Sequence, residues 1–380
     1  MTSKTQWVNE IYEKMEQKLY AECARMGEKI PYWTVGGVYE EDYAKKDIYW
    51  WTNGFWSGIL WQLYHATKKE LYLETARKNE DLLDQALHGF IGLHHDTGFM
   101  WLHSAVADYR LTGCEEAKVR GLNAASVLAG RYNPNGKFIR AWNPECVEEG
   151  EDCTGWIIVD SMMNIPLLYW AGQITGDPRF QQIAVNHADT VASYLVREDG
   201  SCGHIACINP DTGELEHILG GQGYSETSSW SRGQSWILYG FALSYRHTKN
   251  KKYLDIAKKT AHYFISNIAL TGYIPLCDFR QPASAAYTDT SAGLCAACGL
   301  LEIAEHVDEC EKNLYRTYAE LILKHTAETC CDWNPDTDGI VQNCKVAFHN
   351  DRREQTDLIY ADYFLTEAVL RLLGKDFLIW

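Results

Sequence analysis

Asp160 is a single carboxylate inside an almost wholly apolar run, from Gly155 to Ala171. A carboxylate in such surroundings is costly unless it is paired, hydrogen-bonded or protonated. It could be the N-cap of a helix that begins at Ser161, a common structural use of Asp. Alternatively, it could project into a pocket with a raised pKa and act as a general acid. The stretch by itself favours capping and leaves catalysis open.

A second carboxylate, Asp96, follows His94 and His95. Because Thr and Gly come next, Asp96 is typical of a turn or a helix cap. The same three residues could bind a metal. However, the sequence offers no third and fourth ligand at a spacing that is typical of metal sites, so we expect no metal site.

Arg232 precedes Trp236 by one helical turn at the start of an apolar segment. Solvation alone is a poor explanation for an arginine that enters such a helix. We expect it to hold a carboxylate, either a protein Asp or a substrate anion.

Fourteen tryptophans are many for one chain, and Trp50, Trp51 and Trp236 lie near these polar groups. A cleft lined by indoles, with a few carboxylates, His and Arg, is typical of a carbohydrate site. Each of these tryptophans could equally be a core residue. The sequence has neither a phosphate-binding Gly loop nor a Gly-x-Ser-x-Gly elbow.

Helical segments that would position these residues repeat at a period of roughly 45 to 75 residues. The apolar segments are 54–66, 98–110, 161–174, 233–246, 289–305 and 360–373. The amphipathic segments are 7–26, 71–88, 117–131, 180–196, 253–267 and 314–329. Helices that are apolar all round belong inside and amphipathic ones outside.

This alternation predicts an all-α fold, an (α/α)6 barrel that forms a single domain over residues 1–380. A continuous α-solenoid is the alternative, but its repeats would be more uniform in length. The connections from outer to inner helices are the long ones, so functional residues should gather at that end of the barrel.

The net charge of −16 argues against nucleic acid or an anionic membrane as a partner. A small anionic substrate would need a local cationic pocket. No apolar run is long enough to span a membrane, and the N-terminus has no signal region. The thirteen cysteines are scattered, so we expect a cytoplasmic protein with reduced thiols. No cofactor motif is evident, and the sequence does not indicate an oligomeric state.

With these residues in view, the chain resembles glycoside hydrolase family 88, the unsaturated glucuronyl hydrolases. The resemblance rests on the segments 51–58, 95–99, 159–170 and 229–236, and more weakly on 359–364. It implies an (α/α)6 barrel without a cofactor. The implied substrates are oligosaccharides left by polysaccharide lyases, such as chondroitin, hyaluronan and heparin fragments. Their non-reducing end carries a 4,5-unsaturated uronic acid.

The resemblance also implies residue roles. Asp160 matches the acid/base, which protonates C4 and takes a proton from the water that adds at C5. Asp96 matches a second essential carboxylate, which positions substrate or water, and His95 would help to hold the sugar. The implied substrate-binding residues are Trp50 or Trp51, His95, His204, Gln222, Arg232 and Trp236.

The loop 343–356 precedes the last apolar segment and diverges from the pattern expected for the family. In the family, this loop influences the preference for sulfated substrates. Lys345, Arg352 and Arg353 are basic residues within it. They could bind sulfate or be ordinary solvated charges.

Two rival functions follow from the same fold. The related family 105, unsaturated rhamnogalacturonyl hydrolases, acts on pectin fragments by the same vinyl-ether chemistry. The sequence around Asp96 and around Arg232 favours family 88. The other rival is a glycan-binding toroid without catalysis, against which the presence of both Asp96 and Asp160 argues.

Overall fold

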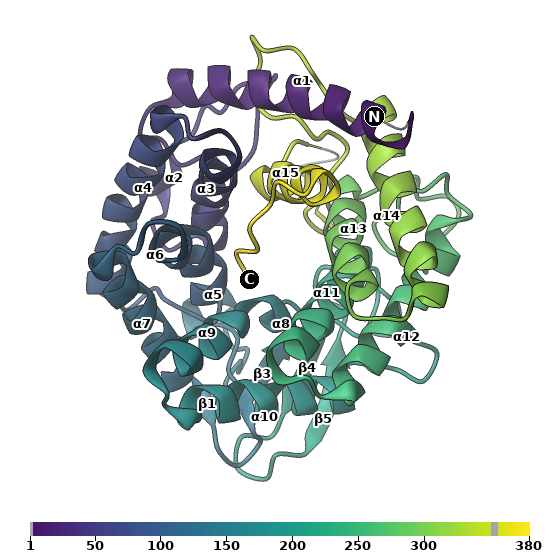
Figure 1. The fold of residues 1–380 in the computed structure, drawn as a ribbon. Coiled ribbons are helices and arrows are strands. Elements are labelled where there is room, and N and C mark those ends of the chain that lie inside the picture. The colour runs from purple at the N-terminus through teal and green to yellow at the C-terminus, as the bar shows by residue number, and fades with distance from the viewer. Residues whose placement is uncertain (1–2, 351–355) are drawn as a thin grey trace.

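Helical hairpins close into a ring in the computed structural model, which describes residues 3–350 and 356–380 (Figure 1). The inner helices are α3 (Phe55–Thr67), α5 (Thr97–Trp101) continued by α6 (Ala107–Thr112), α8 (Ser161–Asn164) continued by α9 (Pro166–Thr175), α11 (Ser231–Thr248), α13 (Thr290–Ala304) and α15 (Ile359–Leu373). The outer helices are α1 (Ser3–Met26), α4 (Glu70–Gly89), α7 (Glu115–Gly130), α10 (Pro178–Tyr194), α12 (Lys251–Ile268) and α14 (Glu309–Thr329). The predicted (α/α)6 barrel is thus confirmed.

Short turns join each of the first five inner helices to the outer helix that follows it. Four of these helices, and also α15, end in a residue with a left-handed backbone, which closes the last helical turn. These residues are Lys68, Gly113, Gly176, Lys249 and Gly374. The long connections therefore all gather at the opposite end of the barrel.

Two of the inner helices are interrupted, which the apolar pattern did not predict. A turn of π-helix, η2 (Leu102–Val106), separates α5 from α6. Pro166 separates α8 from α9, because proline lacks the N–H that a continuous helix needs. The interrupted helices are the two that follow Asp96 and Asp160. Single π-turns within α-helices are frequent at functional sites.

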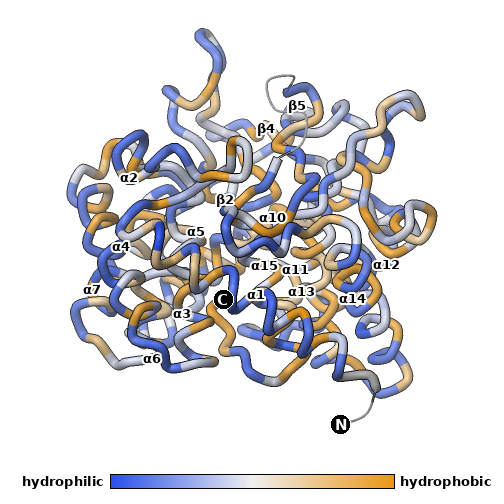
Figure 2. Tube along the Cα trace, turned by 90° about the horizontal axis from the view of Figure 1, so that it is seen from above, coloured by the Kyte–Doolittle hydropathy of each residue, from blue (hydrophilic) through white to orange (hydrophobic). Residues whose placement is uncertain are grey.

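Small β-sheets, also not predicted, lie among the long connections. β1 (Tyr132–Asn133) pairs with β2 (Phe138–Ile139), and the strands β3 (Trp156–Ile158), β4 (Ile205–Ile208) and β5 (Leu215–Leu219) form an antiparallel sheet in that order. Figure 2 shows β4 and β5 at one end of the barrel, opposite the end that carries α6. β3 leads directly to Asp160, and the N–H of Val159 donates to the carbonyl of His204 over 3.0 Å. The sheet thus holds Asp160 beside His204.

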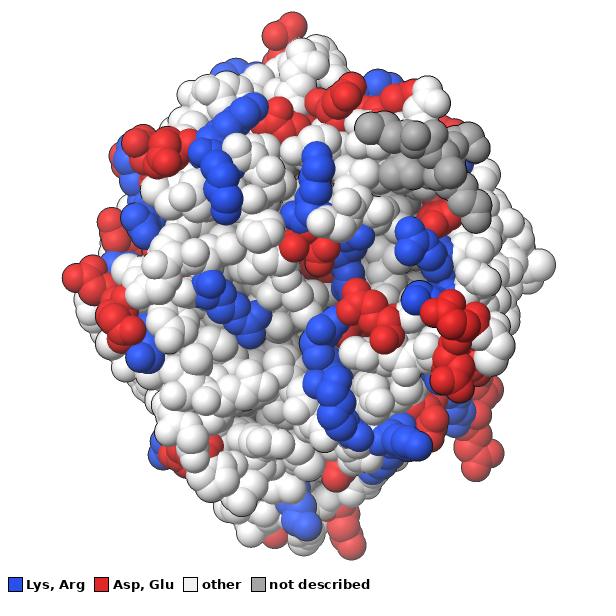
Figure 3. Space-filling view, viewed as in Figure 1, with Lys and Arg blue, Asp and Glu red and all other residues white. Residues whose placement is uncertain are grey.

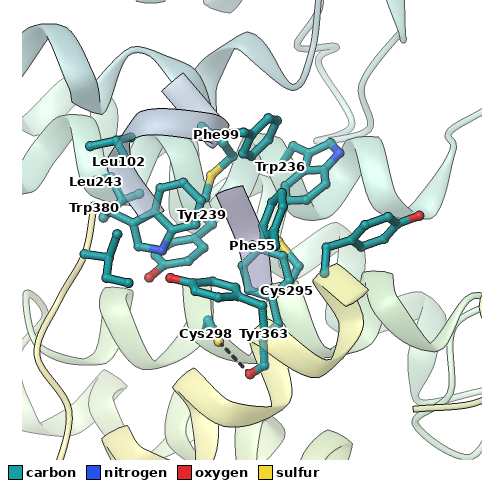
Figure 4. Packing of buried hydrophobic residues seen from close by; sticks show 14 of the residues in the cluster. Phe55, Phe99, Leu102, Trp236, Tyr239, Leu243, Cys295, Cys298, Tyr363 and Trp380 are labelled. Carbon is teal, nitrogen blue, oxygen red and sulfur yellow. Dashed lines mark hydrogen bonds between the residues drawn. The ribbon is translucent and has the colours of Figure 1, made fainter. Parts of the chain in front are cut away.

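Buried aromatic side chains from several inner helices pack against one another (Figure 4). Phe99 packs against Phe55 and Trp236, with ring centroids 5.3 Å apart in each pair. The chain after α15 turns back into the ring and places Trp380, which is 1% exposed, in this core. The indole N–H of Trp380 donates to Glu367 over 2.9 Å. Ile379 and Trp380 therefore form part of the barrel interior.

Charged side chains of both signs are mixed over the end of the barrel that Figure 3 shows. Below them, Glu302 accepts hydrogen bonds from Arg246 and Arg371 and thereby joins three inner helices.

Among the described residues, no helix combines the length and the apolar character that crossing a bilayer requires.

We expect Trp380→Ala to lower the free energy of unfolding by about 3–5 kcal/mol, because it empties a core position and leaves Glu367 without its indole donor. Urea denaturation measures this change. Leu270→Ala is the control, since Leu270 is 85% exposed and should shift stability by less than about 0.5 kcal/mol. A loss below about 1 kcal/mol for Trp380→Ala would show that Trp380 is not an integral part of the core.

Candidate active site

Asp160 stands at the N-cap position of α8, but its side chain makes no capping hydrogen bond. Its Oδ1 is buried without a hydrogen-bond partner, while the side chain as a whole is 17% exposed. The capping interpretation is therefore wrong. The side chain is held at the edge of solvent with part of its hydrogen-bonding capacity unused.

Asp96 lies beside Asp160 in a different environment. Its Oδ1 accepts a hydrogen bond of 2.8 Å from the side-chain amide of Asn164. Its Oδ2 lies 3.3 Å from Nδ1 of His94. Asp96 is also more deeply buried, at 3% exposure. Its turn and cap position was predicted correctly, yet its side chain does not cap α5 either.

His95 lies between the two carboxylates. Its Nε2 is 3.5 Å from Oδ1 of Asp96 and 3.8 Å from Oδ1 of Asp160. Neither ring nitrogen has a hydrogen-bond partner, although the side chain is fully buried. Burial outweighs the attraction of Asp96 and lowers the pKa of His95 to about 4. The imidazole is therefore neutral at neutral pH.

The environments of the two carboxylates drive their pKa values apart. Burial, and then the charge of Asp96, raise the pKa of Asp160 well above its usual range; its own backbone N–H, Arg232 and the backbone N–H of Ser161 offset this only in part. Burial would also raise the pKa of Asp96, but the adjacent histidines and the amide of Asn164 lower it to about 2. The charge of His95, which is protonated at the acidic pH where Asp96 titrates, makes the largest lowering contribution, and the contacts with His94 and the amide of Asn164 add to it. The site thus pairs a proton donor with an ionised carboxylate, which suits acid–base chemistry.

His204 presents a hydrogen-bond donor to the same region. Its Nδ1 accepts the backbone N–H of Gln222 over 3.0 Å, so the proton of the neutral ring lies on Nε2. Nε2 is buried and has no partner. Gly221, at φ +55°, allows this approach, because a Cβ there would lie 1.9 Å from Nδ1. Burial, with Arg232 second, lowers the pKa of His204 to about 3.

Gln222 and Arg232 both hold the segment around Val346. The Gln222 side-chain amide donates to the Val346 carbonyl over 2.8 Å. Arg232 donates to the same carbonyl, to that of Lys345 and to the carboxylate of Asp289, the last over 2.6 Å. Of the two partners expected for Arg232, the structure shows the protein Asp. Direct contact of Gln222 or Arg232 with a substrate remains a prediction.

Lys345 is only 1% exposed, so the interpretation as an ordinary solvated charge is wrong for this residue. Its Nζ donates to the carbonyl of Asn350 over 2.9 Å and lies 4.3 Å from the ring centre of Tyr287. A sulfate contact of Lys345 remains a prediction. Arg352 and Arg353 lie outside the described residues.

The tryptophans differ in burial. Trp236 is 1% exposed and packs in the aromatic core, in agreement with the core alternative. Trp50 and Trp51 are both half-buried. Trp50 packs against Tyr32 at 5.3 Å, and Trp51 packs against Tyr360 at 5.0 Å. Burial does not decide which of these two would stack on a sugar, and their substrate contacts remain predictions.

Sequence reasoning missed Asn164. Its spacing of four residues from Asp160 places it one helical turn further along, which is a signal that could have found it. A possible cation-binding set, His94, His95 and Asp96, does come together, with donor atoms within 4.8 Å of one another. No other His, Cys, Asp or Glu of the described chain joins this set.

Comparisons of the chain with known proteins agree on one family. Residues 32–246 match the model of Glycosyl Hydrolase Family 88. The unsaturated glucuronyl hydrolase of Bacillus sp. (strain GL1) is 35% identical over 357 residues, which cover 92% of each chain.

Solved structures agree. The crystal structure of unsaturated glucuronyl hydrolase, responsible for the degradation of glycosaminoglycan, from Bacillus sp. GL1 superposes with a TM-score of 0.89 at 32% identity, covering 96% of each chain. A mutant unsaturated glucuronyl hydrolase of Streptococcus agalactiae complexed with dGlcA-GalNAc6S superposes with a TM-score of 0.83 at 28% identity, covering 98% of this chain and 93% of that one. The chain therefore belongs to glycoside hydrolase family 88.

Proposed function

We propose that this enzyme removes the 4,5-unsaturated uronic acid from the non-reducing end of glycosaminoglycan oligosaccharides, with Asp160 as general acid and base. The observation that carries the proposal is the pair of unequal carboxylates around the neutral His95. The glycosaminoglycan class is supported by the relatives, one of which degrades glycosaminoglycan and another of which was crystallised with an unsaturated disaccharide.

The substrate is a vinyl ether, and its chemistry requires an acid before a base. The Asp160 proton moves to C4, which leaves positive charge shared between C5 and the ring oxygen. Water then forms a bond to C5 and returns a proton to Asp160. The resulting hemiketal opens to a ketone at C5, and the hemiacetal left at C1 releases the remaining saccharide. Asp160 ends the cycle protonated, as it began.

The surrounding groups fit this sequence. Ionised Asp96 would orient water or a sugar hydroxyl and stabilise the positive charge that develops at C5. His204 offers its Nε2 proton, for which the protein provides no acceptor, to the uronate carboxylate or a hydroxyl. Arg232 would act mainly by fixing the Lys345–Val346 segment and by its positive field. Trp50 or Trp51 would supply the sugar-stacking face.

The placement of the enzyme in the cell follows a separate argument. All thirteen cysteines are free thiols in the structure. Free thiols in such number support a reducing compartment, so we infer a cytoplasmic enzyme that acts on imported oligosaccharides.

A substrate panel tests the proposed function. Unsaturated disaccharides from chondroitin, heparin and rhamnogalacturonan are mixed with the enzyme, and loss of the ultraviolet absorbance of the C4=C5 bond is followed. We expect loss with at least one glycosaminoglycan disaccharide. Loss only with the rhamnogalacturonan disaccharide would instead assign the pectin activity. Binding without any loss would indicate a glycan-binding toroid.

We expect Asp160→Asn to fold normally but to lower turnover by about 10²- to 10⁴-fold. Asn resembles the protonated carboxyl in shape but cannot give up a proton to C4. Steady-state kinetics on the preferred disaccharide measures the rate, and thermal unfolding checks the fold. Asp211→Asn, an exposed carboxylate in the β4–β5 turn, is the control and should keep the wild-type rate. A near-wild-type rate for Asp160→Asn would exclude it as the acid.

A further inference from the structure

We propose that Asn164 is a positioning residue of this reaction, which makes the two catalytic carboxylates unequal by hydrogen-bonding only Asp96. The inference rests on the proposed function for its kinetic consequence. It concerns a fully buried side chain from the same helix as Asp160 that does not itself need to touch the substrate.

The contacts of Asn164 determine its orientation. Its Oδ1 accepts the backbone N–H of Phe99 over 2.7 Å. Because a backbone N–H can only donate, the amide oxygen must face Phe99 and the NH₂ group must face Asp96. Nδ2 donates to Oδ1 of Asp96 over 2.8 Å and reaches the backbone carbonyl of Asp160 over 3.4 Å. Asn164 therefore presents to Asp96 a donor that cannot become an acceptor.

A donor that is fixed in this way favours the ionised form of its carboxylate partner. Asp160 has no corresponding donor on Oδ1 and makes no capping bond to α8. Two like charges in one buried site disfavour each other, so one proton is retained between the two carboxylates. The amide of Asn164 directs that proton to Asp160, where C4 of the substrate would receive it.

Other charged and titratable groups also face Asp96. His94 and His95 come from its own segment, Asp160 from the start of α8, Arg131 from the end of α7 and Cys146 from the loop before β3.

The guanidinium of Arg131 donates its hydrogen bonds to groups other than Asp96. It hydrogen-bonds the carbonyls of Leu93, Arg140, Ala141 and Trp142 and the side chain of Asn143. Its positive charge supports ionised Asp96 at a distance. Asn164, by contrast, is a neutral side chain that donates a hydrogen bond directly to the carboxylate of Asp96.

A merely structural role for Asn164 must be distinguished from positioning. α5 and α8 approach closely at this point, because a Cβ on Gly98 would lie 2.4 Å from Cα of Asn164. Any change at Asn164 can therefore lower stability. Only the loss of the bond to Asp96 should also change the pH dependence of the reaction.

The expected sign follows from the bond that is removed. Without the amide donor, Asp96 binds a proton more tightly, so the acid limb of kcat/KM moves to higher pH by about one unit. Asn164→Asp should move the acid limb further than Asn164→Ala, because it keeps an acceptor for Phe99 and adds a negative charge beside Asp96.

The test compares wild type, Asn164→Ala, Asn164→Asp and Ser161→Ala. Ser161→Ala is the matched control, since the Ser161 hydroxyl is buried in the same helix and donates to the Ile158 carbonyl over 2.6 Å without contacting Asp96. Initial rates on an unsaturated disaccharide are taken after a jump from neutral pH to values between about pH 2 and about pH 8, so that slow acid unfolding does not contribute. Ser161→Ala should lose stability but keep the wild-type acid limb.

A second measurement does not depend on turnover. The carboxyl carbon of Asp96 is followed by NMR in protein carrying ¹³C-labelled aspartate, with Asp96→Asn to assign the signal. We expect its titration to move to higher pH in both Asn164 variants. A wild type that turns over no unsaturated disaccharide overturns the proposed function but leaves this titration to decide the role of Asn164. An acid limb and an Asp96 titration unchanged in both variants overturn the inference.

Discussion

Two carboxylates that share one poorly solvated site cannot both be ionised without a large electrostatic cost. This constraint explains most of the local structure around Asp96 and Asp160. The protein provides a hydrogen-bond donor to one of them and leaves Oδ1 of the other without one. Between them lies an imidazole that burial keeps neutral, so it adds no charge to either side. The result is a proton held at one defined carboxylate.

The barrel makes this arrangement possible because it brings together the starts of inner helices that are distant in sequence. β3 and β4 fix Asp160 beside His204 through the bond from Val159 to the His204 carbonyl. The aromatic core around Phe99 supports the region that holds the two carboxylates. The buried ion pair between Arg232 and Asp289 holds the Lys345–Val346 segment in place. Breaking such a buried pair is more costly than breaking a surface one.

Much of the helical framework follows from the sequence, because completely apolar helices and one-sided helices have distinct patterns. The interruptions do not. The π-turn at Leu102–Val106 and the short strands β3 to β5 depend on tertiary contacts rather than on local preference. Patterning also cannot tell a helix-capping Asp from one whose side chain is left without a cap bond, which is why the stretch around Asp160 by itself favours a cap.

For the site residues too, the sequence predicts the chemistry but not the partners. It predicts that Arg232 needs a carboxylate, but not that its partner is Asp289, 57 residues away. The burial of Lys345 depends on how its loop folds over Tyr287. Nothing in the sequence pattern singles out the partners of Asn164, because its contacts with Phe99 and Asp96 depend on how the helices pack.

The central claim is that Asp160 holds a proton at neutral pH in the resting enzyme. Infrared difference spectroscopy between wild type and Asp160→Asn, without substrate, tests it directly. We expect the substitution to remove a protonated-carboxyl C=O band that shifts in D₂O, whereas Asp96→Asn should remove a carboxylate band. If Asp160→Asn removed only a carboxylate band, Asp160 would be ionised at rest, and the assignment of the acid would be contradicted.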